Sequence, residues 1–179
     1  MDKLYFYKID KEYLDYLYKF DNKVPKHVIV GKAKPFCGVV IAINGLNYFA
    51  PISSYSKKEF TNIAIKELDK NTKKIKIIST IRFCYMIPAP DSVLTIINFK
   101  EQDDYYNNLI VKEYLFCQDH KEDIRIRANK IYNLPSGHQW HKQCCKFKEL
   151  ETGCKEYESI KQLEELQIAE GQAVGTKET

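Results

Sequence analysis

The chain has 179 residues, which is enough for one domain with a substantial core. Hydrophobic residues make up 44% of it, as in an ordinary globular protein, and the longest apolar run is far too short to cross a bilayer. With no signal peptide and six cysteines, the composition predicts a cytoplasmic protein with reduced thiols. We expect a single domain over residues 1–170 and a disordered tail over residues 171–179.

Charge is distributed unevenly along the chain. Residues 57–76 carry seven lysines against three acids, a net of +4, and residues 120–148 carry seven Lys/Arg against two acids, a net of +5. Residues 149–179 carry eight glutamates against three lysines, a net of −5. Two basic segments predict a surface that attracts a polyanion, although a single lysine run is more often a solvated face.

The chain opens with a strand and a short helix. Residues 4–9 favour a strand, and Asp10 is a good N-cap for a helix that ends near Phe20. Residues 21–33 are expected to form a loop, which contains Pro25.

A β-hairpin is the strongest structural signal. Asn44-Gly45 predicts a type I′ turn between strands near 36–43 and 46–52, because both residues tolerate positive φ. Because the second strand folds back along the first, Lys34 and the pair Ser53-Ser54 come to the same end of the hairpin. One cation beside two hydroxyls is a plausible cradle for a phosphate.

Further strands and then helices follow the hairpin. Residues 55–74 are polar and rich in lysine. Part of this segment is expected to be helical, because Phe60, Ile63, Ala64 and Leu68 fall at helical spacings. The remaining strands are expected at 75–81, 82–87 and 93–99, and the helices at 103–117, 121–133, from about 138, and at 156–170. This order predicts an α+β fold, in which a strongly bent antiparallel sheet packs against helices that lie mostly in the C-terminal half.

Four motifs in the first half of the chain resemble those of one protein family. They are Lys34-Pro35-Phe36-x-Gly-Val-Val with its Asn-Gly turn, Tyr48-Phe-Ala-Pro-Ile-Ser-Ser, Tyr85-Met-Ile-Pro88 with Asp91, and the opening Leu4-Tyr-Phe-Tyr7 with the aromatic helix after it. In this order and spacing they resemble the ToxN/AbiQ family, the endoribonuclease toxins of type III toxin–antitoxin systems. The resemblance implies the compact, barrel-like core of small toxin ribonucleases.

The same resemblance implies partners and a biological role. The partner would be a repeat-encoded pseudoknot RNA antitoxin, held with the toxin in a closed hetero-oligomer. Cellular mRNA would be the substrate of the released toxin, with growth arrest and phage defence as the outcome. No cofactor or metal is implied.

RNA can be cut without a metal, because its own 2′-OH attacks the adjacent phosphorus to give a 2′,3′-cyclic phosphate and a 5′-OH. The protein must align the attack, stabilise charge on the phosphoryl oxygens and move protons. Lys34 matches the family's catalytic lysine, and Ser53 and Ser54 match its hydroxyl pair, with Ser-Ser where many relatives have Thr-Ser. Serines are also common at strand ends for a purely structural reason, because their hydroxyls hydrogen-bond to the backbone of turns.

The general base is left open. His27, Tyr48 and Tyr55 are candidates for that role or for contact with RNA. Aromatic side chains are expected to stack on single-stranded bases, with Phe36 among them. The expected RNA-binding residues are Lys32, Phe36, Lys57, Lys58, Lys73, Lys74, Arg125, Arg127 and Lys130.

Two other functions fit parts of the sequence. A non-catalytic module that binds structured RNA would have the same basic segments. A zinc-dependent nuclease could use His138, His141 and Cys145, with Cys144 and Cys154 nearby, but the paired Cys-x-x-Cys spacing of zinc knuckles is missing.

Overall fold

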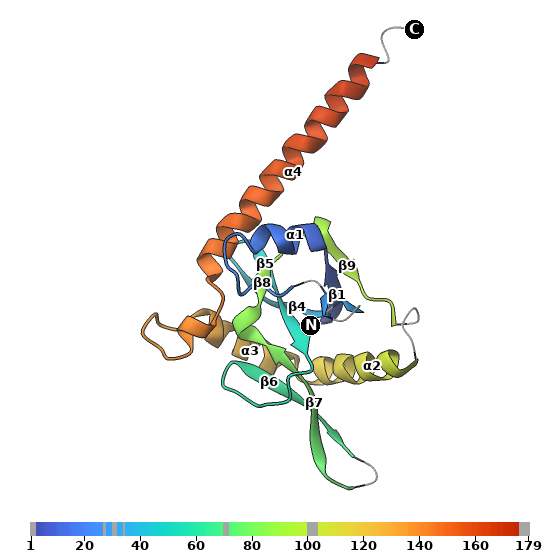
Figure 1. Ribbon diagram of the computed structural model, residues 1–179, viewed down its shortest axis with the longest axis vertical. Coiled ribbons are helices and arrows are strands. Elements are labelled where there is room, and N and C mark those ends of the chain that lie inside the picture. Colours follow the sequence, from blue (N-terminus) through green and yellow to red (C-terminus); the bar gives the residue numbers. More distant parts are fainter. Residues whose placement is uncertain are drawn as a thin grey trace.

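A bent antiparallel sheet forms the centre of the molecule, as the computed structural model shows for residues 3–26, 28–29, 32–33, 35–69, 72–99 and 104–175 (Figure 1). Seven strands are ordered β6-β7-β5-β4-β1-β9, with β8 paired to β5, and β2 and β3 form a separate pair. The strands are β1 (Tyr5–Ile9), β2 (Val28–Ile29), β3 (Lys32–Ala33), β4 (Phe36–Ile43), β5 (Leu46–Ser53), β6 (Asn62–Leu68), β7 (Ile75–Arg82), β8 (Ile87–Pro88) and β9 (Leu94–Ile96). The predicted α+β class with a bent antiparallel sheet is confirmed.

The predicted hairpin is confirmed as β4 and β5. Its turn residues have the positive φ that a type I′ turn requires, 54° at Asn44 and 76° at Gly45. The register of β4 against β5 shifts between Gly38 and Ile41, which is a bulge that bends the strand.

Strand β5 changes partners along its length. Its first part pairs with β4 and β8, and its last two residues, Ile52 and Ser53, pair with Ile81 and Thr80 of β7. This exchange turns the sheet, and it places the end of β5 beside the start of the β6–β7 hairpin, which extends away from the body (Figure 1).

Residues 62–68 form a strand, so the helical expectation for this part of residues 55–74 is wrong. Phe60, Ile63 and Ala64 satisfy a helical spacing, but β6 pairs with β7 from Asn62 to Leu68. The backbone hydrogen bonds of this long-range pairing decide the structure, and local spacing does not reveal them.

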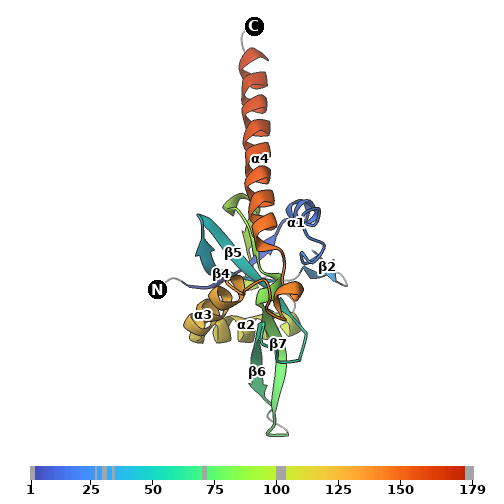
Figure 2. The same ribbon diagram turned by 90° about the vertical axis from the view of Figure 1, so that its left-hand side faces the viewer.

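Four helices complete the described fold: α1 (Lys11–Leu17), α2 (Asp104–Asp119), α3 (Lys121–Tyr132) and α4 (Phe147–Gly175). Figures 1 and 2 show α4 leaving the body as a long arm at the end opposite to the β6–β7 hairpin. Instead of a helix from residue 138 there is a single 3₁₀ turn, His141–Gln143, and α4 starts well before residue 156. Within the described ranges, no helix has the length and apolar character to cross a membrane.

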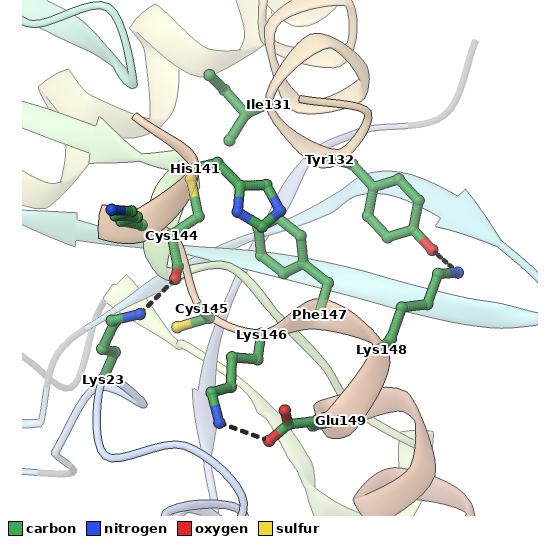
Figure 3. A pocket seen from close by; sticks show the side chains of 11 residues that line it. Lys23, Ile131, Tyr132, His141, Cys144, Cys145, Lys146, Phe147, Lys148 and Glu149 are labelled. Carbon is green, nitrogen blue, oxygen red and sulfur yellow. Dashed lines mark hydrogen bonds and ion pairs between the residues drawn. The ribbon is translucent and has the colours of Figure 1, made fainter. Parts of the chain in front are cut away.

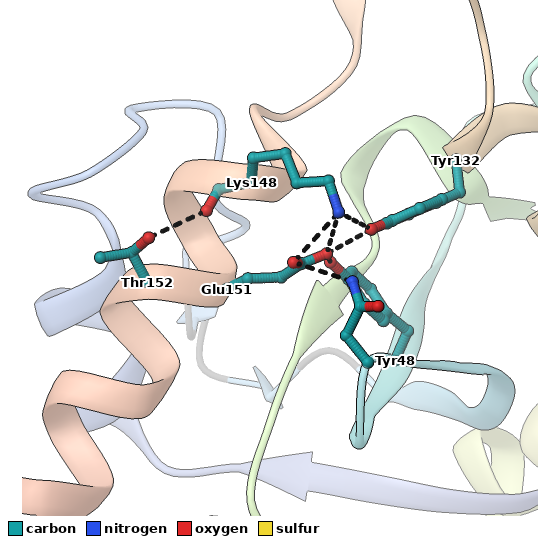
Figure 4. A network of polar contacts seen from close by, with 6 residues as sticks. Tyr48, Tyr132, Lys148, Glu151 and Thr152 are labelled. Carbon is teal, nitrogen blue, oxygen red and sulfur yellow. Dashed lines mark hydrogen bonds and ion pairs between the residues drawn. The ribbon is translucent and has the colours of Figure 1, made fainter.

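The first turns of α4 are fixed to the sheet by a buried carboxylate (Figure 4). The Glu151 side chain accepts hydrogen bonds from the hydroxyl of Tyr48 at 3.0 Å, from the hydroxyl of Tyr132 and from the ammonium of Lys148 at 3.2 Å. Burial alone would raise the pKa of Glu151, but these hydrogen bonds outweigh it and leave the pKa below its ordinary value. The network therefore joins β5, α3 and α4 through one ionised group.

All six cysteines are buried and free of disulfide bonds. Cys37 and Cys84 lie in the hydrophobic core, as their apolar strand contexts predict.

Candidate active site

The two serines lie where β5 ends. Ser53 is half-buried and pairs with Thr80 of β7, whereas Ser54 is exposed. The hydroxyl oxygen of Ser53 accepts a hydrogen bond of 3.3 Å from the backbone N–H of Tyr55, and the hydroxyl of Thr80 donates to the Tyr55 carbonyl at 2.9 Å. The turn after β5 is thus fixed from both sides, with the Ser54 side chain facing solvent.

An arginine beside this turn lies over two tyrosine rings. The guanidinium carbon of Arg82 is 4.7 Å from the centroid of Tyr55 and 4.3 Å from the centroid of Tyr85. Its Nε is buried and makes no hydrogen bond to any described residue. A guanidinium held by two rings keeps its charge and the donors at its edge available for an anion such as a phosphate.

Hydrogen bonds also fix the loop that follows the serines. The Tyr55 hydroxyl donates to Glu59 at 2.6 Å, and Asn62 accepts from the Glu59 N–H and donates to the Lys57 carbonyl, both at 3.0 Å. The hydrogen bond to Glu59 is the main cause that raises the pKa of Tyr55. Tyr55 is therefore protonated at neutral pH, which argues against the general-base role.

Lys34 and His27 lie outside the described residues, as does the side chain of Lys32. Pro35, the chain neighbour of Lys34, is described: its carbonyl accepts a hydrogen bond of 2.9 Å from the N–H of Ile52. The next residue, Phe36, pairs with Pro51. The chain thus enters β4 directly beside the end of β5 that carries the serines.

Two expected RNA contacts are corrected. Phe36 is only 2% exposed and Tyr48 is fully buried, so neither presents a face on which a base could stack. Tyr48 packs against Tyr132 and Phe147, and burial raises its pKa, so it does not act as a base either. Tyr48 belongs to the core because α3 and α4 cover it through Tyr132 and Phe147, whereas Phe36 is buried within the ladder that pairs it with Tyr7 and Pro51.

The expected basic residues fall into separate groups. Arg127 and Lys130 of α3 lie over the ring of Phe60, in the loop after the serines, at 5.7 and 5.0 Å from its centroid. Lys57 and Lys58 are exposed in that same loop, whereas Lys73 and Lys74 are exposed near the far end of the β6–β7 hairpin. Arg125 instead lines a cavity with Tyr5 and Tyr7 of β1.

A second cavity, of about 500 Å³, is lined by cations (Figure 3). The ammonium of Lys23 donates to the Cys144 carbonyl at 2.8 Å, and the ammonium of Lys146 pairs with Glu149 at 3.0 Å. The side chains of His141 and Phe147 belong to its wall, and Lys142 and Lys148 also line it. The four lysines outnumber the two glutamates that pair with them, Glu149 and Glu151, and the remaining positive charge favours an anionic occupant.

The residues of the zinc alternative do not converge. Over the described part of the chain, no group of three or more His, Cys, Asp and Glu side chains is arranged to hold a metal ion. The ring of His138 stacks on Phe60, whereas His141 lines the cation-rich cavity and Cys145 is buried.

Arg82 is the feature that the sequence analysis missed. A local signal was present, since Arg82 interrupts the apolar run Ile81-Arg82-Phe83-Cys84 directly after a strand. Its place beside the serines follows only from the pairing of β5 with β7.

Comparisons with known proteins agree with the fold and the motifs. Residues 5–155 match the family described as "Toxin ToxN, type III toxin-antitoxin system". The chain is 33% identical over 172 residues to Endoribonuclease ToxN of Bacillus thuringiensis subsp. kurstaki, covering 89% of this chain and 87% of the relative. It is 29% identical over 165 residues to Endoribonuclease AbiQ of Lactococcus lactis subsp. lactis, covering 83% of this chain and 86% of that protein.

Solved structures extend the likeness to three dimensions. A structure that describes selective toxin inhibition by a non-coding RNA pseudoknot in type III systems superposes with a TM-score of 0.73 at 32% identity, covering 88% of this chain and 99% of that one. A structure of AbiQ, at 24% identity and a TM-score of 0.76 over 88% of this chain and 99% of that one, shares the fold. The predicted family is confirmed: the chain belongs to the ToxN family of type III toxin–antitoxin systems.

Proposed function

We propose that this protein is a metal-independent endoribonuclease toxin that cuts RNA at the end of β5. The observation that carries the proposal is the guanidinium of Arg82 over the rings of Tyr55 and Tyr85, where the N–H of Tyr55 in turn donates to the hydroxyl oxygen of Ser53, next to Ser54. Relatives across most of the chain are named endoribonucleases, which supports RNA as the substrate.

The reaction is an attack within the RNA strand. The 2′-oxygen bonds to the adjacent phosphorus as its proton leaves, and the bond from phosphorus to the 5′-oxygen breaks as that oxygen takes up a proton. The products are a 2′,3′-cyclic phosphate and a 5′-OH. Every atom comes from the RNA, so the protein's task is to align the strand and to stabilise negative charge.

Each residue of the site has a role in this proposal. Ser53 and Ser54 donate hydrogen bonds to the non-bridging oxygens of the scissile phosphate, and Arg82 neutralises charge beside them. Lys34 adds a second positive charge. It is bonded to Pro35, which is hydrogen-bonded to Ile52 next to Ser53, and this connection supports its assignment.

The proposed partner is a pseudoknot RNA antitoxin, which the toxin processes and which inhibits it within a closed toxin–RNA hetero-oligomer. The solved relative described as selectively inhibited by a non-coding RNA pseudoknot supports this partner. Cellular mRNA is then the substrate of the free toxin, in the cytoplasm. The outcome for the cell is growth arrest during phage infection.

Product analysis of purified protein tests the chemistry. Wild type should cut RNA in the presence of a chelator and leave 2′,3′-cyclic phosphate ends, and a 2′-deoxy substitution at the cleavage site should abolish cutting. Cutting that needs a divalent metal, or that persists at the deoxy position, would contradict the mechanism.

The Lys34→Ala variant separates catalysis from binding. We expect it to bind RNA but to cut it on the order of 10²–10³ more slowly, the usual loss of one electrostatic donor. If wild type binds RNA and never cuts it, the protein is a non-catalytic RNA-binding module instead.

A further inference from the structure

Three aromatic rings from distant segments stack near the serine loop. The ring centroids of Phe60 and His138 are 5.4 Å apart with their planes inclined by 26°, and those of Phe60 and Trp140 are 6.5 Å apart at 18°. Phe60 belongs to the loop after Ser54, and the other two belong to the segment between α3 and α4. All three side chains are partly exposed, so the stack lies at the surface.

The rings are held in place by the backbone around them. The N–H of Trp140 donates to Nδ1 of His138 at 3.2 Å, and the Trp140 carbonyl accepts from the N–H of Gln143 at 3.0 Å. On the other side, the guanidinium of Arg127 donates to the carbonyl of Phe60. A surface that is already ordered loses little conformational entropy when a flat ligand binds to it.

Positive charge surrounds the stack. Arg127 and Lys130 lie over the Phe60 ring, and no carboxylate is hydrogen-bonded or ion-paired to either in the described structure. Aromatic faces next to unpaired cations suit a ligand with a flat ring and a phosphate, as each nucleotide of single-stranded RNA has.

The loop between residues 54 and 62 joins this stack to the proposed cleavage site. Glu59, next to Phe60, accepts the hydrogen bond of Tyr55, and Asn62 pairs with Arg82 in the β6–β7 ladder. The stack and the Arg82 site therefore share one loop, which is hydrogen-bonded at both of its ends.

We propose that Phe60, His138 and Trp140 form a platform on which one nucleobase of single-stranded RNA stacks, next to the bond that is cut. This inference rests on the proposed function, because it assigns a base-binding subsite to the same RNA. Arg127 and Lys130 bind the backbone phosphates of that nucleotide. A platform of this kind accepts every base and adds affinity more than sequence preference.

The single tryptophan of the chain makes the proposal directly measurable. Short single-stranded 2′-O-methyl oligonucleotides, which cannot be cut, are titrated against the full protein while its tryptophan fluorescence is recorded. We expect saturable quenching by the single strands, with little response to a 2′-O-methyl duplex or to inorganic phosphate. Oligonucleotide binding that leaves the fluorescence unchanged would overturn the platform.

Three variants complete the test. Trp140→Ala should bind the oligonucleotides about 5- to 150-fold more weakly, the loss expected for one base–aromatic stack, whereas Trp140→Phe should stay close to wild type. Tyr18→Ala is the matched control, since Tyr18 is an exposed ring with a lysine 5.9 Å from its centroid and lies outside the proposed site. Circular dichroism checks that each variant is folded.

The two proposals fail in different ways. If Trp140→Ala binds and cuts RNA like wild type, the platform is wrong and the cleavage function stands. If Trp140→Phe loses as much affinity as Trp140→Ala, stacking is not the cause and the platform is again overturned. Failure of wild type to cut any RNA, with quenching still observed, would overturn the cleavage function and support the platform.

Discussion

The guanidinium carbon of Arg82 lies 4.7 Å from the centroid of the Tyr55 ring, at the end of the strand that carries Ser53. The same carbon lies 4.3 Å from the centroid of the Tyr85 ring. Arginine is suited to this place because its flat charged group stacks on rings and still offers donors at its edge. Lysine carries a compact ammonium in place of this flat group and cannot stack and offer two parallel donors in the same way, so the two should not be interchangeable here.

Arg82→Ala should therefore slow RNA cleavage on the order of 10²–10³, and Arg82→Lys should recover only a small part of the rate. Single-turnover cleavage assays with matched RNA-binding measurements give these values. Lys155→Ala is the control, since Lys155 is exposed on α4 away from the site. Full activity in Arg82→Lys would show that charge alone is needed and that the stacked geometry is not.

Glu151 should stabilise the docking of α4 only while it is ionised. Glu151→Gln is expected to lower the free energy of unfolding by about 2 kcal/mol, because a neutral amide accepts weaker hydrogen bonds than the carboxylate it replaces. The lowered pKa of Glu151 means that the folded state holds its proton less tightly than the unfolded state. Its contribution is present above pH 4.5 and is lost as the pH falls through the folded-state pKa.

Urea unfolding at several pH values tests this expectation. The matched control is Glu149→Gln, because Glu149 forms an exposed pair with Lys146 and should contribute almost nothing. Equal losses in the two variants would mean that burial of the Glu151 network does not matter.

Glu113 of α2 should have the opposite effect on stability. Its side chain is buried and burial raises its pKa to about 7, an effect that the hydroxyl of Ser79 offsets only in part. The folded protein therefore binds this proton more tightly than the unfolded chain, so stability should decrease as the pH rises from 4.5 to about 7. The decrease is on the order of 3 kcal/mol and levels off at higher pH.

Glu113→Gln should remove this dependence and be more stable than wild type above about pH 7. Glu122→Gln, at an exposed position in the first turn of α3, serves as the control. A Glu113→Gln variant whose stability follows the same pH curve as wild type would show that this carboxyl does not titrate between the two states.

Gly38 should not tolerate a side chain. A Cβ at this position would lie 2.1 Å from Cδ1 of Phe49, the residue opposite it in the β4–β5 ladder. Gly38→Ala is expected to cost about 3 kcal/mol of unfolding free energy through overpacking. Gly137→Ala, where nothing lies within 4 Å, should change thermal stability little; similar melting temperatures for both variants would contradict the expectation.

Local signals in the sequence predicted the elements that depend on few residues. The hairpin at Asn44-Gly45 is one, because the turn itself requires positive φ. The helix after Asp10 is another, although the Asp10 side chain makes no capping hydrogen bond. Residues 62–68 were predicted to be helical because the same apolar spacing fits a helix and a strand. The spacing does not reveal that this segment pairs with β7, the strand that follows it.

For the candidate site, too, only the features that local motifs determine could be predicted from the sequence. The motifs located Ser53 and Ser54, but the burial of Tyr48 depends on Tyr132 and Phe147 from helices that begin much later in the sequence. The grouping of Arg82 with Tyr55, and of Trp140 with Phe60, likewise follows from long-range pairing. No local pattern marks residues that meet only in the folded chain.

The central claim is that the hydroxyls of Ser53 and Ser54 hold the phosphate that is cut. The most direct test is the single-turnover rate of RNA cleavage by the Ser53→Ala/Ser54→Ala double variant, with RNA binding measured in parallel. The account predicts a rate lower by about 10²–10³ or more, with binding within a few-fold of wild type. Cleavage at the wild-type rate by a folded double variant would contradict it.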